Sequence, residues 1–527
     1  MSTRKFYTQP PNLTPSQFPL PPFLPLCPPP QTPPPTLPRR PKLSPPQGFT
    51  STSYSVPAAY PRSTPDSTGT LHRFSEPFQL TPPKEWESKE ERRARLNEEA
   101  LEVARKRYHT RRWGIEEALT AKPPGLWLAV ERWRRDEVED GEGLTLVMAH
   151  ANGFLKEDWH PTLHRLLAKS PPSQSSIFGE SPFPVLPLNP DRRVTPLPST
   201  TRIDDIYLLD DVIHASSLDL NKGKLGPVHL WSDRGRDIIN FIEHILPTFS
   251  EGVPSWGLAL PKGRKPKVIG VGHSLGGNAI IQAAAHRPDL FHAIFLLDPM
   301  APPIYIDTQQ EPSDLSAWPL LTLSVSRRSI WPSRQSAVEH ALKSNFFKRY
   351  HPEVLKIWKS HALVSLPPTY SSDFSLTPSG TPTTEGTLST SEAPSSVTTI
   401  TTTASMTTEK KPTEEEEDGP VTLATAPWCE ATSFAESTGL AEGWELLPKV
   451  TIPAGFLMAG DSRTTYGDDI TREMVYRAPI SRNEKVIGSS HQILQERPDD
   501  IADALWRFIG NVIFAQSSER RMERAKL

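Results

Sequence analysis

Residues 268–279 read V-I-G-V-G-H-S-L-G-G-N-A. The β-branched run before Gly272 is typical of a buried strand, and the small and apolar residues after Gly276 are typical of a helix. Between them lies the pattern G-x-S-x-G, which holds a serine on a sharp turn from strand to helix. Side chains beside such a turn would collide, and the two glycines remove them. The first amides of the helix would then point to the place where negative charge develops at Ser274.

The composition limits the class of protein. The chain has 527 residues and 59 prolines, so part of its length is expected to be disordered. Its formal net charge of −3 gives no indication of a nucleic-acid partner or of an anionic membrane as a partner. Two cysteines, Cys27 and Cys429, favour a reducing compartment and exclude a cysteine-rich zinc site, and we predict neither a metal nor another cofactor. No apolar run reaches the roughly 18 residues of a transmembrane segment, and the N-terminus lacks an apolar signal core.

Changes of composition divide the chain into seven parts. Proline and Ser/Thr content favours disorder in the first part, and the fifth contains T-T-I-T-T-T and an acidic run that cannot bury enough apolar surface to fold. We expect a disordered arm, a charged helical lead-in, the first part of a core, a helical cap, a disordered Ser/Thr/Glu-rich insert, the second part of the core and a tail, over residues 1–90, 91–124, 125–300, 301–366, 367–435, 436–515 and 516–527.

Apolar strands alternate with helices on both sides of the G-x-S-x-G turn. The expected strands are residues 126–132, 144–149, 203–209, 268–271, 291–297, 450–458 and 485–488. Most of these runs are apolar throughout, which is typical of strands covered on both faces, and they predict an α/β fold with a mostly parallel, doubly wound sheet. Within the cap, apolar residues at helical spacing predict helices over 333–347 and 352–363.

Three side chains far apart in the sequence could supply hydrolytic chemistry. The hydroxyl of Ser274 is a poor nucleophile and needs a base, and His491 lies just past the last expected strand. A carboxylate must orient the imidazole. Asp298 and Asp461 each follow an expected strand, and both remain open. We favour Asp298, because Arg463 stands where the usual spacing would place an acid.

The loop H-A-N-G-F at 150–154 follows a buried strand well before the serine. Backbone amides near Asn152 or Phe154, together with the amide of Leu275, are the expected donors to an oxyanion. We interpret His150 as a structural residue that braces this loop.

Several separated motifs, in order, resemble those of the α/β-hydrolase superfamily and of its fungal branch of peroxisomal lipase-like and toxin-biosynthesis hydrolases. They are H-A-N-G-F at 150–154, I-D-D-I-Y-L-L-D-D-V-I-H at 203–214, W-S-D-R-G-R-D at 231–237, G-H-S-L-G at 272–276 and L-L-D-P-M at 296–300. The resemblance implies an α/β-hydrolase fold and hydrolysis of an ester or acyl group, with Ser274 as nucleophile and His491 as base. It implies no single substrate.

The ending Ala525-Lys526-Leu527 resembles the S-K-L peroxisomal address. We therefore expect an import receptor as a partner and a peroxisomal location, with a cytoplasmic location as the alternative. Three hypotheses of function remain. The first is a serine hydrolase of a hydrophobic carboxylic ester or thioester, and the second is a secondary-metabolite hydrolase that uses the same triad. The third is a non-catalytic binding protein with this fold.

Overall fold

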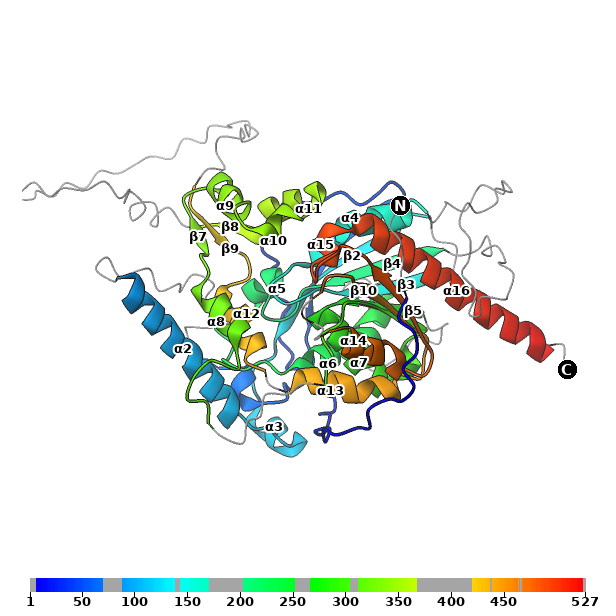
Figure 1. Cartoon of the computed structure of the whole chain (residues 1–527), viewed down its shortest axis with the longest axis horizontal. Helices are drawn as coiled ribbons and strands as arrows, with labels where there is room; N and C mark the ends of the chain where they lie inside the picture. Colours follow the sequence, from blue (N-terminus) through cyan, green and yellow to red (C-terminus); the bar gives the residue numbers. More distant parts are fainter. Residues whose placement is uncertain are drawn as a thin grey trace, which may run out of the picture.

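The computed structural model describes residues 6–69, 88–137, 143–169, 202–251, 266–303, 311–366, 419–436, 438–462, 464 and 467–524. Helices cover both faces of one mostly parallel sheet, and a smaller cap stands to one side (Figure 1). The predicted fold class is confirmed. Within these ranges, no helix combines the length and the apolarity that crossing a bilayer requires.

The main sheet has eight strands in the order β1-β2-β4-β3-β5-β6-β10-β11. Its strands are β1 (Phe49–Pro57), β2 (Trp127–Arg135), β3 (Leu144–Ala149), β4 (Ile203–Leu209), β5 (Lys267–His273), β6 (Ala293–Leu297), β10 (Ala454–Ala459) and β11 (Ser481–Val486). β1 and β2 pair antiparallel, as do β2 and β4, and every later pair is parallel. The loops that follow β3, β5, β6 and β11 therefore meet at one edge of the sheet.

The last strand differs from the prediction. We expected residues 485–488, whereas β11 spans Ser481–Val486 and pairs with β10 at the edge of the sheet. Its sequence is S-R-N-E-K-V, and polar side chains of this kind are common on edge strands. An apolar run is therefore a poor guide to this strand.

Buried apolar side chains form one cluster on each face of the sheet. The helices are α2 (Lys89–His109), α3 (Ile115–Ala121), α4 (His160–Leu167), α5 (Ala215–Leu220), α6 (Trp231–Asn240), α7 (Leu275–His286), α8 (Pro319–Ser326), α9 (Arg334–Ala341), α10 (Asn345–Lys348), α11 (Pro352–Ile357), α12 (Pro427–Phe434), α13 (Gly439–Leu446), α14 (Asp468–Arg477), α15 (Ile493–Glu496) and α16 (Pro498–Arg524). α6, α7, α13 and α14 contribute to one cluster, and α4 and α16 contribute to the other. In β3, Val147 joins the first cluster while Leu146 and Met148 join the second, which explains its continuous apolar sequence.

The cap contains a small sheet that the sequence did not predict. Its strands are β7 (Ile330–Trp331), β8 (Leu363–Ser365) and β9 (Val421–Leu423), with β9 in the middle. β9 and α12 lie inside the range 367–435 that we expected to be disordered, so that expectation was wrong for their residues. Val421 and Leu423 are buried against the cap, and a run this short is hidden by the low-complexity sequence before it. Residues 367–418 lie outside the described ranges.

The single helix expected over 333–347 is two helices. α9 ends at Ala341 and α10 begins at Asn345. The hydroxyl of Ser344 accepts a hydrogen bond from the amide of Phe346, which caps α10 and interrupts the helical ladder. The helix expected over 352–363 is α11, which continues through a wide turn at Trp358–Ala362.

The described part of the expected disordered arm, residues 6–69, is ordered instead. Its final segment forms β1, and the earlier residues, which we call the strap, run over the core at 6–47. The fully buried guanidinium of Arg236 donates to the carbonyls of Leu24 at 2.8 Å and Pro25 at 3.1 Å. Proline has no amide that must find an acceptor, so a proline-rich strap can lie on the protein and offer only its carbonyls. Composition alone did not reveal these acceptors.

We predict that Leu24→Ala lowers the free energy of unfolding by about 2 kcal/mol, because it empties a site against the core. Leu24 is 8% exposed, whereas Leu13, in the same strap, is 42% exposed. Leu13→Ala is the matched control and should change the stability by less than about 0.5 kcal/mol. Denaturant unfolding of both variants measures the difference, and equal effects would contradict an ordered strap.

Candidate active site

The turn between β5 and α7 holds Ser274 in a left-handed conformation, with φ of 55° and ψ of −116°. A Cβ atom at Gly272 would lie 2.4 Å from the carbonyl oxygen of Gly276. A Cβ atom at Gly276 would lie 2.4 Å from the carbonyl oxygen of Ala149. Both glycines are therefore needed for the turn itself and for the close approach of the loop after β3.

The structure brings Ser274, His491 and Asp298 into one hydrogen-bonded chain. His491 Nε2 lies 2.8 Å from Ser274 Oγ, and His491 Nδ1 lies 2.7 Å from Asp298 Oδ2. Ser274 follows β5, Asp298 follows β6, and His491 follows β11, so the parallel sheet places all three at one edge. Ser274 is 5% exposed and Asp298 is fully buried, so these hydrogen bonds are shielded from water.

Of the two carboxylates that the sequence left open, Asp298 is the one against the imidazole. Its Oδ1 accepts from the amide of Ala459 at 3.2 Å, and its Oδ2 accepts from the hydroxyl of Ser462 at 2.6 Å. Asp461 instead donates its backbone amide to the carbonyl of Ser489 at 2.8 Å. Sequence reasoning missed Ser462, because nothing in its surroundings marks a serine after β10 as a partner of a distant aspartate.

His273 is a second residue that sequence reasoning missed, although it occupies the variable position of G-x-S-x-G. Its Nε2–H donates to the carbonyl of His491 at 2.8 Å, and the side chain is fully buried. Burial lowers the pKa of His273 to about 3, so the ring stays neutral and keeps one N–H to donate. His273 therefore holds the backbone of His491 in place, and with it the position from which the His491 imidazole reaches Ser274.

The loop at 150–154 lies directly beside the serine turn. Nδ1 of His150 donates to the carbonyl of Ala151 at 2.7 Å, and its Nε2 accepts from the amide of Asp211 at 3.1 Å. His150 thus braces the loop from inside. The side chain of Asn152 is also held, since its Nδ2 donates to the carbonyl of Glu430 at 3.1 Å.

The three candidate oxyanion amides are not equivalent. The amide of Phe154 donates to the carbonyl of Ala151 at 3.2 Å, so it is already used within the turn. For the amides of Asn152 and Leu275, the described part of the chain offers no hydrogen-bond acceptor. Leu275 is the first residue of α7, where backbone amides have no partner within the helix.

An aromatic cluster from the cap stands over this loop. The ring of Phe154 stacks on Phe346 of α10, with centroids 6.4 Å apart, and lies 6.5 Å from the ring of His273. Phe346 also contacts Phe347 and Tyr350. The approach to Ser274 is therefore bordered by apolar rings on the cap side.

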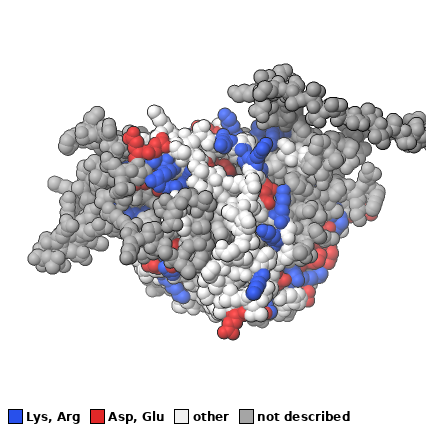
Figure 2. Space-filling view, turned by 180° about the vertical axis from the view of Figure 1, so that it is seen from behind, with Lys and Arg blue, Asp and Glu red and all other residues white. Residues whose placement is uncertain are grey.

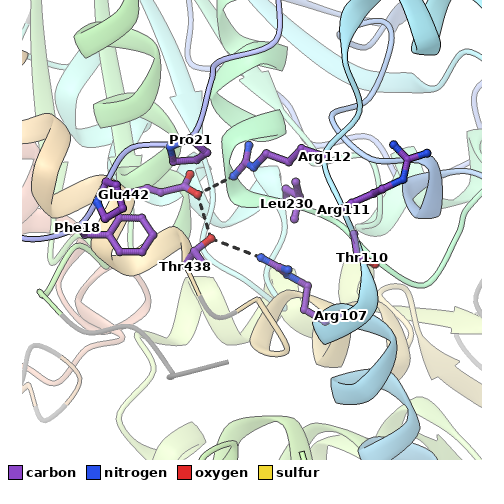
Figure 3. A pocket seen from close by; sticks show the side chains of 10 residues that line it. Phe18, Pro21, Arg107, Thr110, Arg111, Arg112, Leu230, Thr438 and Glu442 are labelled. Atoms are coloured by element: carbon purple, nitrogen blue, oxygen red, sulfur yellow. Dashed lines mark hydrogen bonds and ion pairs between the residues drawn. The ribbon is translucent and has the colours of Figure 1, made fainter. Parts of the chain in front are cut away.

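A cavity of about 170 Å³ lies where the strap meets α2, α6 and α13 (Figure 3). Arg107 and Arg112 approach it and bind the carboxylates of Glu436 and Glu442, each at 2.6 Å. Thr438 donates to Glu442 at 2.9 Å and accepts from Arg107 at 3.5 Å, and Figure 3 draws these two contacts together with the pair of Arg112 and Glu442. Both cations are paired with carboxylates, so these contacts join α2 and the segment after it to α13 and the segment before it.

With the geometry established, comparison with known proteins identifies the class. A sequence model of the alpha/beta hydrolase family matches residues 146–504, and the chain belongs to this family. It is 22% identical over 241 residues to the peroxisomal membrane protein LPX1 of Saccharomyces cerevisiae, which is 44% of this chain and 51% of that protein. It is 28% identical over 208 residues to the type I acyl-CoA thioesterase mpaH of Penicillium brevicompactum, which is 39% of this chain and 37% of that protein.

These curated relatives are matched over only about half of their length or less. A solved structure of the peroxisomal alpha-beta-hydrolase Lpx1 from S. cerevisiae superposes with a TM-score of 0.53 at 14% identity. The superposition covers 91% of this chain and 97% of that one. It supports the fold, and the resemblance to fungal hydrolases of this branch is confirmed.

A buried acid lies near the site, beneath the cap. Asp158 is 3% exposed, and its Oδ2 accepts from Nε2 of Gln495 at 3.1 Å. Burial raises the pKa of Asp158 to about 7, and the charges of Glu157 and Asp210 act in the same direction. Oε1 of Gln495 is buried without a donor among the described residues.

We predict that Asp158 makes stability depend on pH between about 4 and 7. In this window the unfolded carboxyl has lost its proton while the folded one keeps it, so stability falls as pH rises and then levels off. Asp158→Asn removes this pH dependence. The free energy of unfolding of the variant minus that of the wild type should therefore be roughly 1–3 kcal/mol larger at high pH than at low pH. Denaturant unfolding at about pH 5 and pH 8 measures this change. Asp469→Asn, at a side chain that is 95% exposed, is the matched control. Parallel curves for the wild type and Asp158→Asn would contradict the assignment.

Proposed function

We propose that the protein is a serine hydrolase that cleaves a hydrophobic carboxylic ester or thioester through an acyl-enzyme. The observation that supports this proposal is the hydrogen-bonded chain from Ser274 through His491 to Asp298, at 2.8 Å and 2.7 Å. Nucleophile, base and orienting acid stand in the order that such catalysis requires. Membership of the α/β hydrolase family agrees with this chemistry.

In the acylation step, Oγ of Ser274 attacks the carbonyl carbon while Nε2 of His491 takes the hydroxyl proton. Asp298 keeps Nδ1 protonated and stabilises the resulting imidazolium. The carbonyl oxygen becomes an oxyanion, and the amides of Leu275 and Asn152 are proposed to bind it. The loss of one donor of this kind typically costs about 2.7–4 kcal/mol of transition-state stabilisation.

The tetrahedral intermediate then collapses, and the bond to the leaving oxygen or sulfur breaks. His491 passes its proton to that atom, which leaves as an alcohol or a thiol, while the acyl group stays on Ser274. A water molecule repeats the attack in the second half of the cycle, with His491 again as base and then as acid. The products are a carboxylic acid and the free enzyme.

The aromatic cluster of the cap favours an apolar acyl group, because its rings border the approach to Ser274. A thioester of coenzyme A is the second candidate substrate, and the 28% identity to an acyl-CoA thioesterase favours it. Hydrolysis rates on acyl esters and acyl-CoA thioesters of increasing chain length separate the two. Such a thioesterase in secondary metabolism would use the same three residues.

We also propose a peroxisomal location, read by an import receptor from the ending Ala525-Lys526-Leu527. These three residues lie outside the described ranges. The name of the yeast relative, a peroxisomal protein, supports the proposal. A fluorescent protein fused ahead of the chain would report the location, and one that stays diffuse would count against the address.

We predict that Ser274→Ala folds but loses at least about 10³-fold in kcat, because no other hydroxyl can form the acyl-enzyme. A fluorophosphonate probe should label the wild type and not this variant. Ser53→Ala, an exposed serine on β1, is the matched control and should keep full activity and labelling. A wild-type protein that the probe never labels would favour the non-catalytic binding protein.

We predict that Asp298→Asn lowers kcat by a factor on the order of 10⁴, because the amide no longer holds the imidazole in the productive tautomer. Asp461→Asn is the matched control, and its kcat should stay within about twofold of the wild type. Steady-state kinetics on one soluble ester compare the two variants directly. The reverse ranking would assign the acid to Asp461 and contradict the geometry.

A further inference from the structure

The cap carries an exposed stretch in which apolar and cationic side chains alternate. Residues 342–349, which we call the cap patch, read L-K-S-N-F-F-K-R and join the end of α9 to α10. Leu342 is 37% exposed and Phe346 is 39% exposed. Lys343 and Lys348 are exposed beside them. Both side chains are partly exposed on the same short stretch, and apolar side chains grouped at a surface and bordered by polar ones can mark an interaction site.

The charge of the cap departs from that of the chain. The cap sequence 301–366 contains eight lysines and arginines against five acidic residues, and its part 319–366 holds all eight cations with only two of the acids, although the whole chain has a formal net charge of −3. Seen from behind, several Lys and Arg side chains lie near the top of the described surface, and others lie lower down among Asp and Glu (Figure 2). The cap therefore presents a positive face to a partner.

Four lysines of the cap have no carboxylate partner in the part of the chain that the structure describes. They are Lys343, Lys348, Lys356 and Lys359. Some surface cations elsewhere are paired, as Lys485 is with Asp468 at 2.9 Å and Arg507 with Glu484 at 2.7 Å. Unpaired ammonium groups around exposed apolar side chains are complementary to a surface that offers both anions and hydrocarbon.

We propose that the cap patch docks on an anionic phospholipid surface. The headgroup phosphates would attract the lysines, and each such residue near an anionic bilayer contributes enough to change affinity about fivefold. Leu342 and Phe346 would enter the boundary between headgroups and acyl chains, while the lysine stems extend outward. A nucleic acid or an acidic protein would use the cations but would leave the two apolar side chains in water.

Docking would also bring the membrane to the candidate active site. Phe346 of the cap patch stacks on Phe154, whose loop lies beside Ser274. A hydrophobic substrate could then pass from the bilayer to the serine without crossing water. This consequence rests on the proposed function, whereas docking itself does not.

Vesicle flotation of the full chain tests the proposal, with Ser274→Ala as the background so that hydrolysis cannot alter the lipid. We expect binding to phosphatidylcholine vesicles that contain about 30 mol% phosphatidylserine and little binding to phosphatidylcholine alone. Lys343→Gln with Lys348→Gln should weaken binding about 20-fold, and high salt should weaken it as well. Leu342→Ser should weaken it by about fivefold or more.

The matched control is Lys122→Gln with Lys449→Gln, two exposed lysines that have no carboxylate partner among the described residues, and it removes the same charge away from the cap, after α3 and after α13 (Figure 1). Its vesicle binding should stay within about twofold of the parent protein. Failure of the parent to bind anionic vesicles would overturn the proposal, as would equal losses in the control. Unchanged binding of Leu342→Ser would overturn it too, since a purely electrostatic contact needs no apolar side chain. Hydrolysis of a soluble ester by the lysine variants with Ser274 intact reports the proposed function separately.

Discussion

The conformation of Ser274 is the constraint on which the rest of the site depends. A residue with a side chain at φ of 55° and ψ of −116° costs on the order of 1–3 kcal/mol, and it persists only where its surroundings hold it. Three backbone hydrogen bonds do so. The amide of Ser274 donates to Leu297, and its carbonyl accepts from Met300 and Asn278. The strand β6 and the helix α7 therefore fix the serine from both sides before any substrate arrives.

The carboxyl ends of the parallel strands bring together residues that are far apart in the sequence. His491 lies 217 residues from the serine and 193 residues from Asp298, and only the parallel packing of β5, β6, β10 and β11 brings them together. Each member is also held by a neighbour. Asp298 stands at φ of 39° between two strands, and His273 fixes the carbonyl of His491. The backbone thus fixes the positions of the three residues, and only the side-chain rotamers remain to be set.

The dependence of the site on contacts between distant segments explains what the sequence could and could not predict. Strands that are buried on both faces can be recognised from their apolar sequence. Leu144–Ala149 and Ile203–Leu209 were predicted with the bounds that the structure has. The order of the strap could not be recognised from its sequence, because extended proline-rich segments have no periodic pattern. They are held by distant hydrogen-bond donors such as Arg236. Ser462 and His273 are similar cases. Their partners lie 164 residues away for Ser462 and 218 residues away for His273, and no local spacing encodes such a contact.

The cap shows where the fold leaves room for movement. Its small sheet is anchored by segments remote in sequence, since β9 pairs with β7 and β8, and His361 donates to the carbonyl of Pro41 in the strap at 2.9 Å. α10 is different, because none of its residues is buried. It is also the element whose Phe346 covers Phe154. Elements with little burial open at low free energy, so α10 is held on Phe154 less firmly than the small sheet is held in the cap.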